Sequence, residues 1–277
     1  MKRLRRNVLV LASIAMIGST WAPAHASDFD LLGIHYDTGE LYGISTSGAT
    51  PTLIGTTGIP GFGSLELAPD GTLYGFTTST DATLYIINPA DGSTTEVGPL
   101  NAAFVFDGSL VFSPGGTVYG TNHDSYLNPE LFTLDILTGE ATIVGTIGGG
   151  AHDINAMAWR DDGMLIGLDR VTNSLLAIDP SDASSSFIAT VDPVVGAVGG
   201  MAVLGDTAYF TTSGPGGPLA GSNELYSFDL LSTGNLTRVG SLSPTITGTG
   251  ISGLAVPEPA SLLLMILGGF VVLRRHF

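Results

Sequence analysis

A module of about 45 residues recurs along most of this chain, and a repeat of that period limits the possible folds more than any other feature. Each copy begins with a short apolar segment and a turn rich in Pro, Asp and Gly, followed by a segment that ends in Tyr-Gly or a similar pair. A segment of the form Leu-Tyr-x-Ile-Asp comes next, then a turn such as Thr-Gly, then a segment that ends in Val-Gly. Complete copies occupy residues 64–98, 109–145, 156–190 and 200–240.

Each module carries four short strand-like segments, a pattern typical of β-propeller blades, and no part of the repeat region has sustained helical periodicity. Residues 31–55 match only the last three segments of a module, and residues 252–256 match only the first. The two ends together therefore predict one more blade. We expect an all-β, five-bladed β-propeller, closed by N- and C-terminal strands in one blade. An open β-sandwich would leave the missing and the spare segment unexplained.

Glycines occupy the same place in the second strand of four modules, at Gly33, Gly75, Gly120 and Gly167. A glycine inside a strand often marks the close approach of another backbone. The pattern predicts that these glycines pack against the neighbouring blade.

The first 26 residues have the three parts of a secretory signal peptide. Lys2 and three arginines precede an apolar run, residues 8–17, which is too short to span a membrane. Ala24 and Ala26 then form the small-x-small pattern that signal peptidase cleaves. We expect export, with Ser27 as the first residue of the mature protein.

The C-terminal segment, residues 257–277, contains a second targeting signal. It begins with Pro257, Glu258 and Pro259, continues with the apolar residues 260–273, and ends in Arg274, Arg275 and two further residues. The prolines prevent continuation of the last strand, and the apolar run predicts a membrane helix. At about 1.5 Å per residue this helix is short for a bilayer core of about 30 Å, and the terminal arginines orient their end toward the cytoplasm.

This order of Pro-Glu-Pro, apolar helix and basic end resembles the PEP-CTERM sorting signal. The resemblance covers residues 256–277 and implies a Gram-negative bacterium, processing by an exosortase, transient anchoring in the inner membrane, and delivery to the cell surface or the extracellular matrix. The C-terminal family also takes its label from ice-binding proteins. The Leu-Tyr-x-Ile-Asp strands are similar to those of NHL- and quinoprotein-type propellers, a generic similarity that transfers no ligand.

The body of the protein, residues 27–256, is strongly acidic. Of the chain's 25 acidic and 9 basic residues, the body contains every acidic one except Glu258 but only three arginines. Such a surface repels phosphate backbones, so we expect no nucleic-acid partner. The acidic balance favours divalent cations, although no cofactor is predicted. The chain has no cysteine, which excludes thiol nucleophiles and thiolate metal sites.

Propeller topology sends the short, regular turns to one face and the long, irregular loops to the other. Asp residues in the short turns are expected to stabilise turn geometry. The long-loop face is the predicted binding face, because binding residues concentrate on loops that a rigid scaffold supports. Its candidate residues are His35, Asn122, His123, Asp124, His152, Asp153, Asp169 and Arg170.

Two His-Asp pairs, at residues 123–124 and 152–153, lie in loops of adjacent modules and could approach each other as a metal or acid–base site requires. Solvated loop residues and turn caps are the alternative interpretation. We therefore predict a non-catalytic surface or matrix module that binds a glycan or a surface protein. An envelope polysaccharide hydrolase or lyase using these His and Asp residues is the alternative, and an ice-binding protein is a third.

Overall fold

The structure is a computed structural model, and it describes residues 28–101, 105, 108–123, 128–160, 162–191, 198–212, 223–230 and 235–257. Within these ranges every regular element is a β-strand, and no helix is long and apolar enough to cross a membrane. The signal-peptide residues 1–26, Ser27, and the tail from Glu258 onward, with Arg274 and Arg275, lie outside the described residues. The three-part division of the chain therefore stays a prediction.

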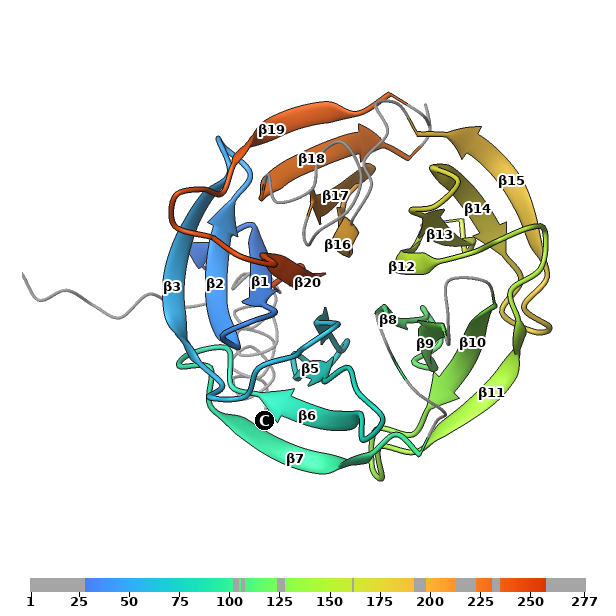
Figure 1. Cartoon of the computed structure of the whole chain (residues 1–277), viewed down its shortest axis with the longest axis horizontal. Helices are drawn as coiled ribbons and strands as arrows, with labels where there is room; N and C mark the ends of the chain where they lie inside the picture. The colour runs from blue at the N-terminus through green and yellow to red at the C-terminus, as the bar shows by residue number, and fades with distance from the viewer. Residues whose placement is uncertain are drawn as a thin grey trace, which may run out of the picture.

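In the described part of the chain, twenty strands form five four-stranded sheets, arranged as blades around a central axis (Figure 1). Blade 1 contains β20 (Ile251–Ala255), β1 (Leu31–His35), β2 (Glu40–Ser45) and β3 (Thr50–Thr56). Blade 2 contains β4 (Glu66–Leu67), β5 (Leu73–Phe76), β6 (Thr83–Ile87) and β7 (Thr94–Pro99). Blade 3 contains β8 (Leu110–Phe112), β9 (Val118–His123), β10 (Pro129–Leu134) and β11 (Ala141–Thr146). Blade 4 contains β12 (Ile154–Trp159), β13 (Leu165–Asp169), β14 (Ser174–Ile178) and β15 (Ser185–Thr190). Blade 5 contains β16 (Val198–Leu204), β17 (Thr207–Thr212), β18 (Glu224–Asp229) and β19 (Thr237–Ser241).

The two ends of the repeat region meet in blade 1, which confirms the predicted closure. Strand β20 pairs antiparallel with β1, so that Ala255 lies opposite Leu32 and Gly253 opposite Ile34. The order β20-β1-β2-β3 places the last strand of the chain innermost, beside the axis (Figure 1). The ring is therefore closed by backbone hydrogen bonds between residues more than 200 positions apart.

A β-bulge recurs at the same place in all five blades, between the third and fourth strands. In blade 1 the register shifts between Leu41 and Tyr42, and Ile54 on the facing strand is the extra residue. The equivalent extra residues are apolar in every blade: Val97, Val144, Ile188 and Val239. Each of them packs against a hydrophobic cluster, so the bulge turns one more apolar side chain of the outer strand inward.

The described residues form five hydrophobic core clusters, and each lies between two adjacent blades. One cluster joins blades 4 and 5 through residues such as Leu168 and Phe210, and another joins blades 1 and 2 through Ile34 and Leu73. The remaining three clusters fill the other gaps between neighbours in the same way. Because each blade shares its apolar surface with both neighbours, its packing depends on the complete ring.

The predicted role of the second-strand glycines is wrong. A Cβ atom on Gly33, Gly75, Gly120 or Gly167 would meet atoms of the same blade, chiefly a large side chain of the third strand. These third-strand side chains are Ile44, Ile87, Phe132 and Ile178. Small residues are required there mainly because the side chain on the next strand covers them, and none of the nearest atoms belongs to the backbone of the adjacent blade.

Glycines that do approach the next blade include those of the Ile-Gly and Val-Gly pairs on the outer strands. A Cβ on Gly55 would overlap the Asp91 carbonyl of blade 2, and one on Gly98 would overlap the Thr138 carbonyl of blade 3. The contact at Gly145 is less close, since a Cβ added there would lie 3.2 Å from the Asp182 carbonyl oxygen of blade 4. The outer strand of one blade thus contacts the last turn of the next.

Candidate functional site

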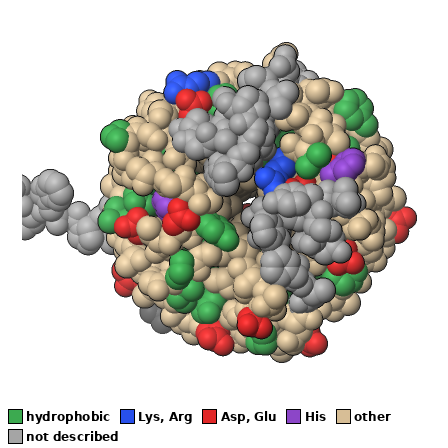
Figure 2. Space-filling view, viewed as in Figure 1, with side chains coloured by type: hydrophobic (Ala, Val, Ile, Leu, Met, Phe, Trp, Pro, Cys, Tyr) green, Lys and Arg blue, Asp and Glu red, His purple; other side chains and the backbone are tan. Residues whose placement is uncertain are grey.

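The carboxylates of the short-turn face have the predicted role in turn geometry. On the short-turn face, Asp carboxylates accept hydrogen bonds from backbone N–H groups two residues ahead, as Asp70 does from Thr72 at 2.9 Å and Asp179 does from Ser181 at 2.9 Å. These Asx-type bonds confirm that these carboxylates stabilise turns. Figure 2 shows the opposite, long-loop face, where basic and acidic side chains lie next to each other close to the centre.

Blade 4 holds a polar cluster on the long-loop face, centred on a buried ion pair. Asp153 immediately precedes β12 and is fully buried, and its Oδ2 lies 2.5 Å from Nε of Arg170, which follows β13. The Arg170 side chain is 14% exposed. The amide of Asn155 fits between the two when its nitrogen donates to Asp153 Oδ1 and its oxygen accepts from Arg170 Nε at 3.2 Å. The pair is thus both buried and hydrogen-bonded, the condition under which a charged pair is tolerated inside a protein.

Asp169 and His152 are the second pair in this cluster. The Asp169 carboxylate is fully buried and accepts backbone hydrogen bonds from His152 at 2.9 Å and Val171 at 2.9 Å. The His152 ring is partly exposed, and its Nδ1 lies 3.8 Å from Asp169 Oδ2. Asp169 therefore connects the segment before β12 to the loop after β13, and His152 lies at the edge of the cluster.

His35 lies in blade 1, on the far side of the ring from this cluster (Figure 1). Its ring is buried, Nδ1 accepts the backbone N–H of Asp37 at 3.1 Å, and Nε2 donates to the Thr247 carbonyl at 2.7 Å. Asp37 in turn accepts two hydrogen bonds from Thr249, through its N–H at 2.7 Å and its hydroxyl at 2.8 Å. The two residues tie the start of the chain to the segment that leads into β20.

The remaining candidates belong to blade 3. Asn122 lies in β9 and is buried, and its Oδ1 has no hydrogen-bond partner among the residues that the structure describes. The sequence places His123 in a loop, whereas it is the last residue of β9; nothing is described of its side chain, and Asp124 lies outside the described residues. Whether the two His-Asp pairs meet therefore stays a prediction. In the described ranges, no three His, Asp or Glu side chains form a group that could hold a metal ion.

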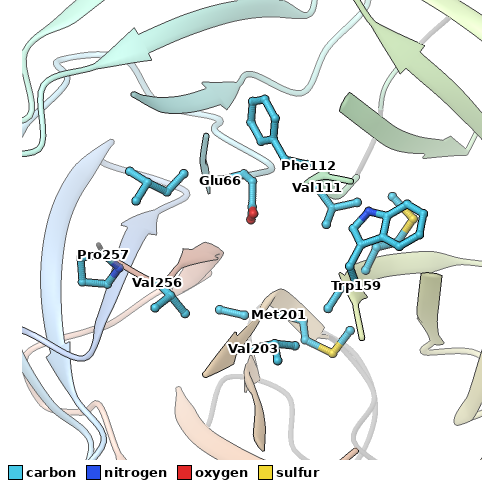
Figure 3. A pocket seen from close by; sticks show the side chains of 12 residues that line it. Glu66, Val111, Phe112, Trp159, Met201, Val203, Val256 and Pro257 are labelled. Atoms are coloured by element: carbon cyan, nitrogen blue, oxygen red, sulfur yellow. The ribbon is translucent and has the colours of Figure 1, made fainter. Parts of the chain in front are cut away.

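A second site, which the loop analysis missed, lies at the axis on the short-turn face. The C-terminal ends of all five innermost strands surround a cavity of about 360 Å³ (Figure 3). Apart from Glu66, its lining side chains are apolar or aromatic, among them Phe112, Met201 and Val203. Val256 and Pro257 complete the lining. Among the described lining residues, Glu66 alone has an ionisable side chain.

The Glu66 carboxyl points toward the centre of this cavity (Figure 3). Although the residue keeps some accessible surface, the protein atoms packed around its carboxyl desolvate it, and this desolvation raises its pKa well above the ordinary 4.5. A hydrogen bond from the backbone N–H of Phe112 opposes that increase. Trp159 lines the same cavity, and its Nε1 is buried without a hydrogen-bond partner in the described part of the chain.

Comparison with solved structures finds β-propeller-like chains. A chain of a nidogen/laminin complex is 13% identical, with a TM-score of 0.51 over 82% of this protein and 85% of that chain. A protein of unknown function from Bacteroides caccae is 12% identical, with a TM-score of 0.50 over 82% of this protein and 86% of that chain. At these identities the likeness shows the fold alone. No family model matches the sequence, and no curated protein matches it.

Proposed function

We propose that this protein is an exported β-propeller, sorted by an exosortase through its PEP-CTERM-type tail, that binds a glycan or a surface protein non-catalytically with its long-loop face. The observation that carries the proposal is the position of Pro257. This residue is the last that the structure describes, and it lines the cavity on the short-turn face, opposite the long loops. A protein held by this segment presents its long-loop face away from the membrane.

The contacts of the long-loop face support binding rather than catalysis. Asp153 is neutralised by Arg170, and Asp169 accepts backbone N–H groups, so both carboxylates already have structural partners. A general acid or base needs a proton that it can exchange with a substrate at hydrogen-bond distance. The buried ion pair instead fixes the strand ends from which the loops start. A preorganised binding surface requires such a rigid support.

Processing in a Gram-negative host that encodes an exosortase tests the sorting half of the proposal. The intact protein should be cleaved near residues 257–259 and recovered at the surface or in the matrix without its tail. Replacement of Pro257, Glu258 and Pro259 by alanine should leave the protein in the inner membrane with an uncleaved mass. A chain that ends at Val256 should be secreted in soluble form. Membrane fractionation and intact mass measure these outcomes, and unchanged processing of the alanine variant would remove the sorting role.

A glycan array tests the binding half. The purified protein should retain ligands from the surface polymers of its host, and Arg170→Ala should weaken retention because the variant disturbs the base of the loops. Arg160→Ala is the matched control, since Arg160 makes its ion pair with Asp162 on the short-turn face. Release of shortened polysaccharide during incubation would contradict a non-catalytic role and favour the hydrolase or lyase alternative.

A further inference from the structure

We propose that the cavity on the short-turn face binds a small organic ammonium ion, with the carboxylate of Glu66 at its charged group and the indole of Trp159 beside it. This site is independent of the long-loop face. It lies at the opposite end of the axis and draws its lining from the innermost strand of every blade (Figure 3).

The volume of the cavity matches that of ligand sites, and all but one of its lining side chains are apolar or aromatic. A volume of about 360 Å³ lies within the range of about 300–1,000 Å³ found for small-molecule pockets, which are mostly apolar with few polar groups. Here the walls include two methionines, Met157 and Met201, whose flexible, polarisable side chains adapt to different apolar shapes. The apolar part of a small ligand would therefore be accommodated without loss of a protein hydrogen bond.

The charge of the site selects a cation. Glu66 contributes the one ionisable group of the lining, and the chain around it has a formal net charge of −16. A desolvated carboxyl gains most from a partner that favours its ionised form, which a positive ligand does and a neutral or negative ligand does not. The field of an acidic protein also raises the local concentration of cations.

Trp159 provides the second recognition element. Tyr119 holds its ring at a centroid distance of 6.0 Å, with the two planes inclined by 58°. Trp offers the best aromatic face for an ammonium group, and an alkylammonium body also packs on it.

Tryptophan fluorescence makes the proposal testable, because the chain has two tryptophans and one of them lies in the cavity. The full-length chain carrying Trp21→Phe is purified in detergent, so that Trp159 alone emits. It is titrated at pH 8 with n-butylammonium, 1-butanol and butanoate, three probes of similar size and different charge. Butylammonium should change the emission saturably and bind at least tenfold more tightly than butanol, and butanoate should not bind.

Substitutions at Glu66 provide the decisive comparison. Glu66→Gln keeps the shape of the side chain but should reduce butylammonium binding to within twofold of butanol, whereas Glu66→Asp should retain the preference for the cation. Glu96→Gln, on the exposed outer strand β7, is the matched control and should change nothing. Circular dichroism melting confirms that each variant is folded.

A pH series completes the test. Butylammonium stays protonated well above pH 8, so its affinity should rise with pH as the Glu66 carboxyl ionises, and this dependence should disappear in Glu66→Gln. Equal affinities for butylammonium and butanol, unchanged cation binding by Glu66→Gln, or no saturable change in emission would each overturn the proposal. All of these results are independent of the sorting and of the glycan binding proposed above.

Discussion

At the scale of single residues, the buried Asp153–Arg170 pair gives the sharpest stability prediction. Asp153→Asn removes one charge and leaves Arg170 in a site where its side chain is only 14% exposed. Loss of one partner of a buried pair costs about 3–5 kcal/mol, and we expect a decrease of that size in the free energy of unfolding. Asp162→Asn breaks an exposed Asp–Arg pair and should lower the free energy of unfolding by less than about 1 kcal/mol. Urea unfolding measures both, and equal losses would contradict a buried role for Asp153.

Glu66 gives a second prediction for a single residue, and here the substitution should stabilise the protein. Its folded-state pKa is raised by desolvation, so the folded protein binds more protons than the unfolded chain between the ordinary pKa and the raised one. Stability is therefore lost as the pH rises through that interval. Glu66→Gln removes the penalty and should stabilise the protein at pH 8, with no difference at pH values below the ordinary pKa of about 4.5. Thermal unfolding at pH 4 and pH 8 tests this, and a variant that is less stable at pH 8 would show that ionised Glu66 is favourable.

At the scale of strands and blades, the sequence predicted where each strand lies but not which glycine contacts which neighbour. Period-two alternation and turn residues identify strands locally, and the incomplete modules at the two ends predict their pairing in blade 1. The approach of Gly55 to the Asp91 carbonyl depends on how two blades incline around the axis. That inclination comes from packing among all five clusters, and a linear pattern contains no direct signal for it.

Substitution of the outer-strand glycines tests these contacts between blades. Gly55→Ala and Gly98→Ala place a methyl group on a carbonyl oxygen of the next blade, and overpacking of this kind costs about 1–3 kcal/mol. Gly145→Ala should cost less, since its Cβ would lie 3.2 Å from the nearest atom. Blade 4 already has Ala189 at the equivalent position. Chemical denaturation ranks the three variants, and a larger loss for Gly145→Ala would contradict the predicted order.

In the candidate sites, contacts between residues close in sequence were predictable, whereas contacts that depend on strand register or on the closed ring were not. Asx turns at Asp70 and Asp179 were predictable, because each carboxylate contacts a backbone group two residues away. The Asp153–Arg170 pair joins residues 17 positions apart through the register of β12 with β13, and sequence alone shows only that both are near strand ends. Glu66 and Trp159 come from different blades and share a cavity only because the ring closes. A loop-based search therefore could not find them.

At the scale of the whole molecule, closure by β20 should decide whether the domain folds. This strand pairs with β1, accepts a hydrogen bond from Thr211 of blade 5 at the Ile251 carbonyl, and donates one from Ser252 to the Phe62 carbonyl beside blade 2. Deletion of residues 251–256 removes these links and opens the cluster between blades 5 and 1. We expect loss of cooperative thermal unfolding by circular dichroism. Deletion of residues 272–277 is the length-matched control, and a cooperative transition in both proteins would contradict the role of β20.

The proposed sorting of the chain also fixes which face of the ring lies near the membrane. Pro257 lines the cavity on the short-turn face, and only two residues separate it from the apolar run at 260–273. Three residues span at most roughly 11 Å, so a membrane-held precursor should have its short-turn face against the bilayer. The absence of cysteine allows single labels to measure this. Thr80→Cys marks an exposed position on the long-loop face, and Pro114→Cys marks an exposed turn on the other.

In spheroplasts that contain the uncleaved precursor, a bulky maleimide reagent should label Thr80→Cys several-fold faster than Pro114→Cys, because the bilayer hinders access to the short-turn face. In chains that also end at Val256 the two rates should become similar, since nothing then orients the ring. Equal rates in the precursor, or faster labelling of Pro114→Cys, would contradict the proposed orientation. The comparison also separates the two proposed sites, because a ligand from outside the cell reaches the long-loop face directly, whereas an ammonium ion reaches the Glu66 cavity through the narrow space beside the membrane.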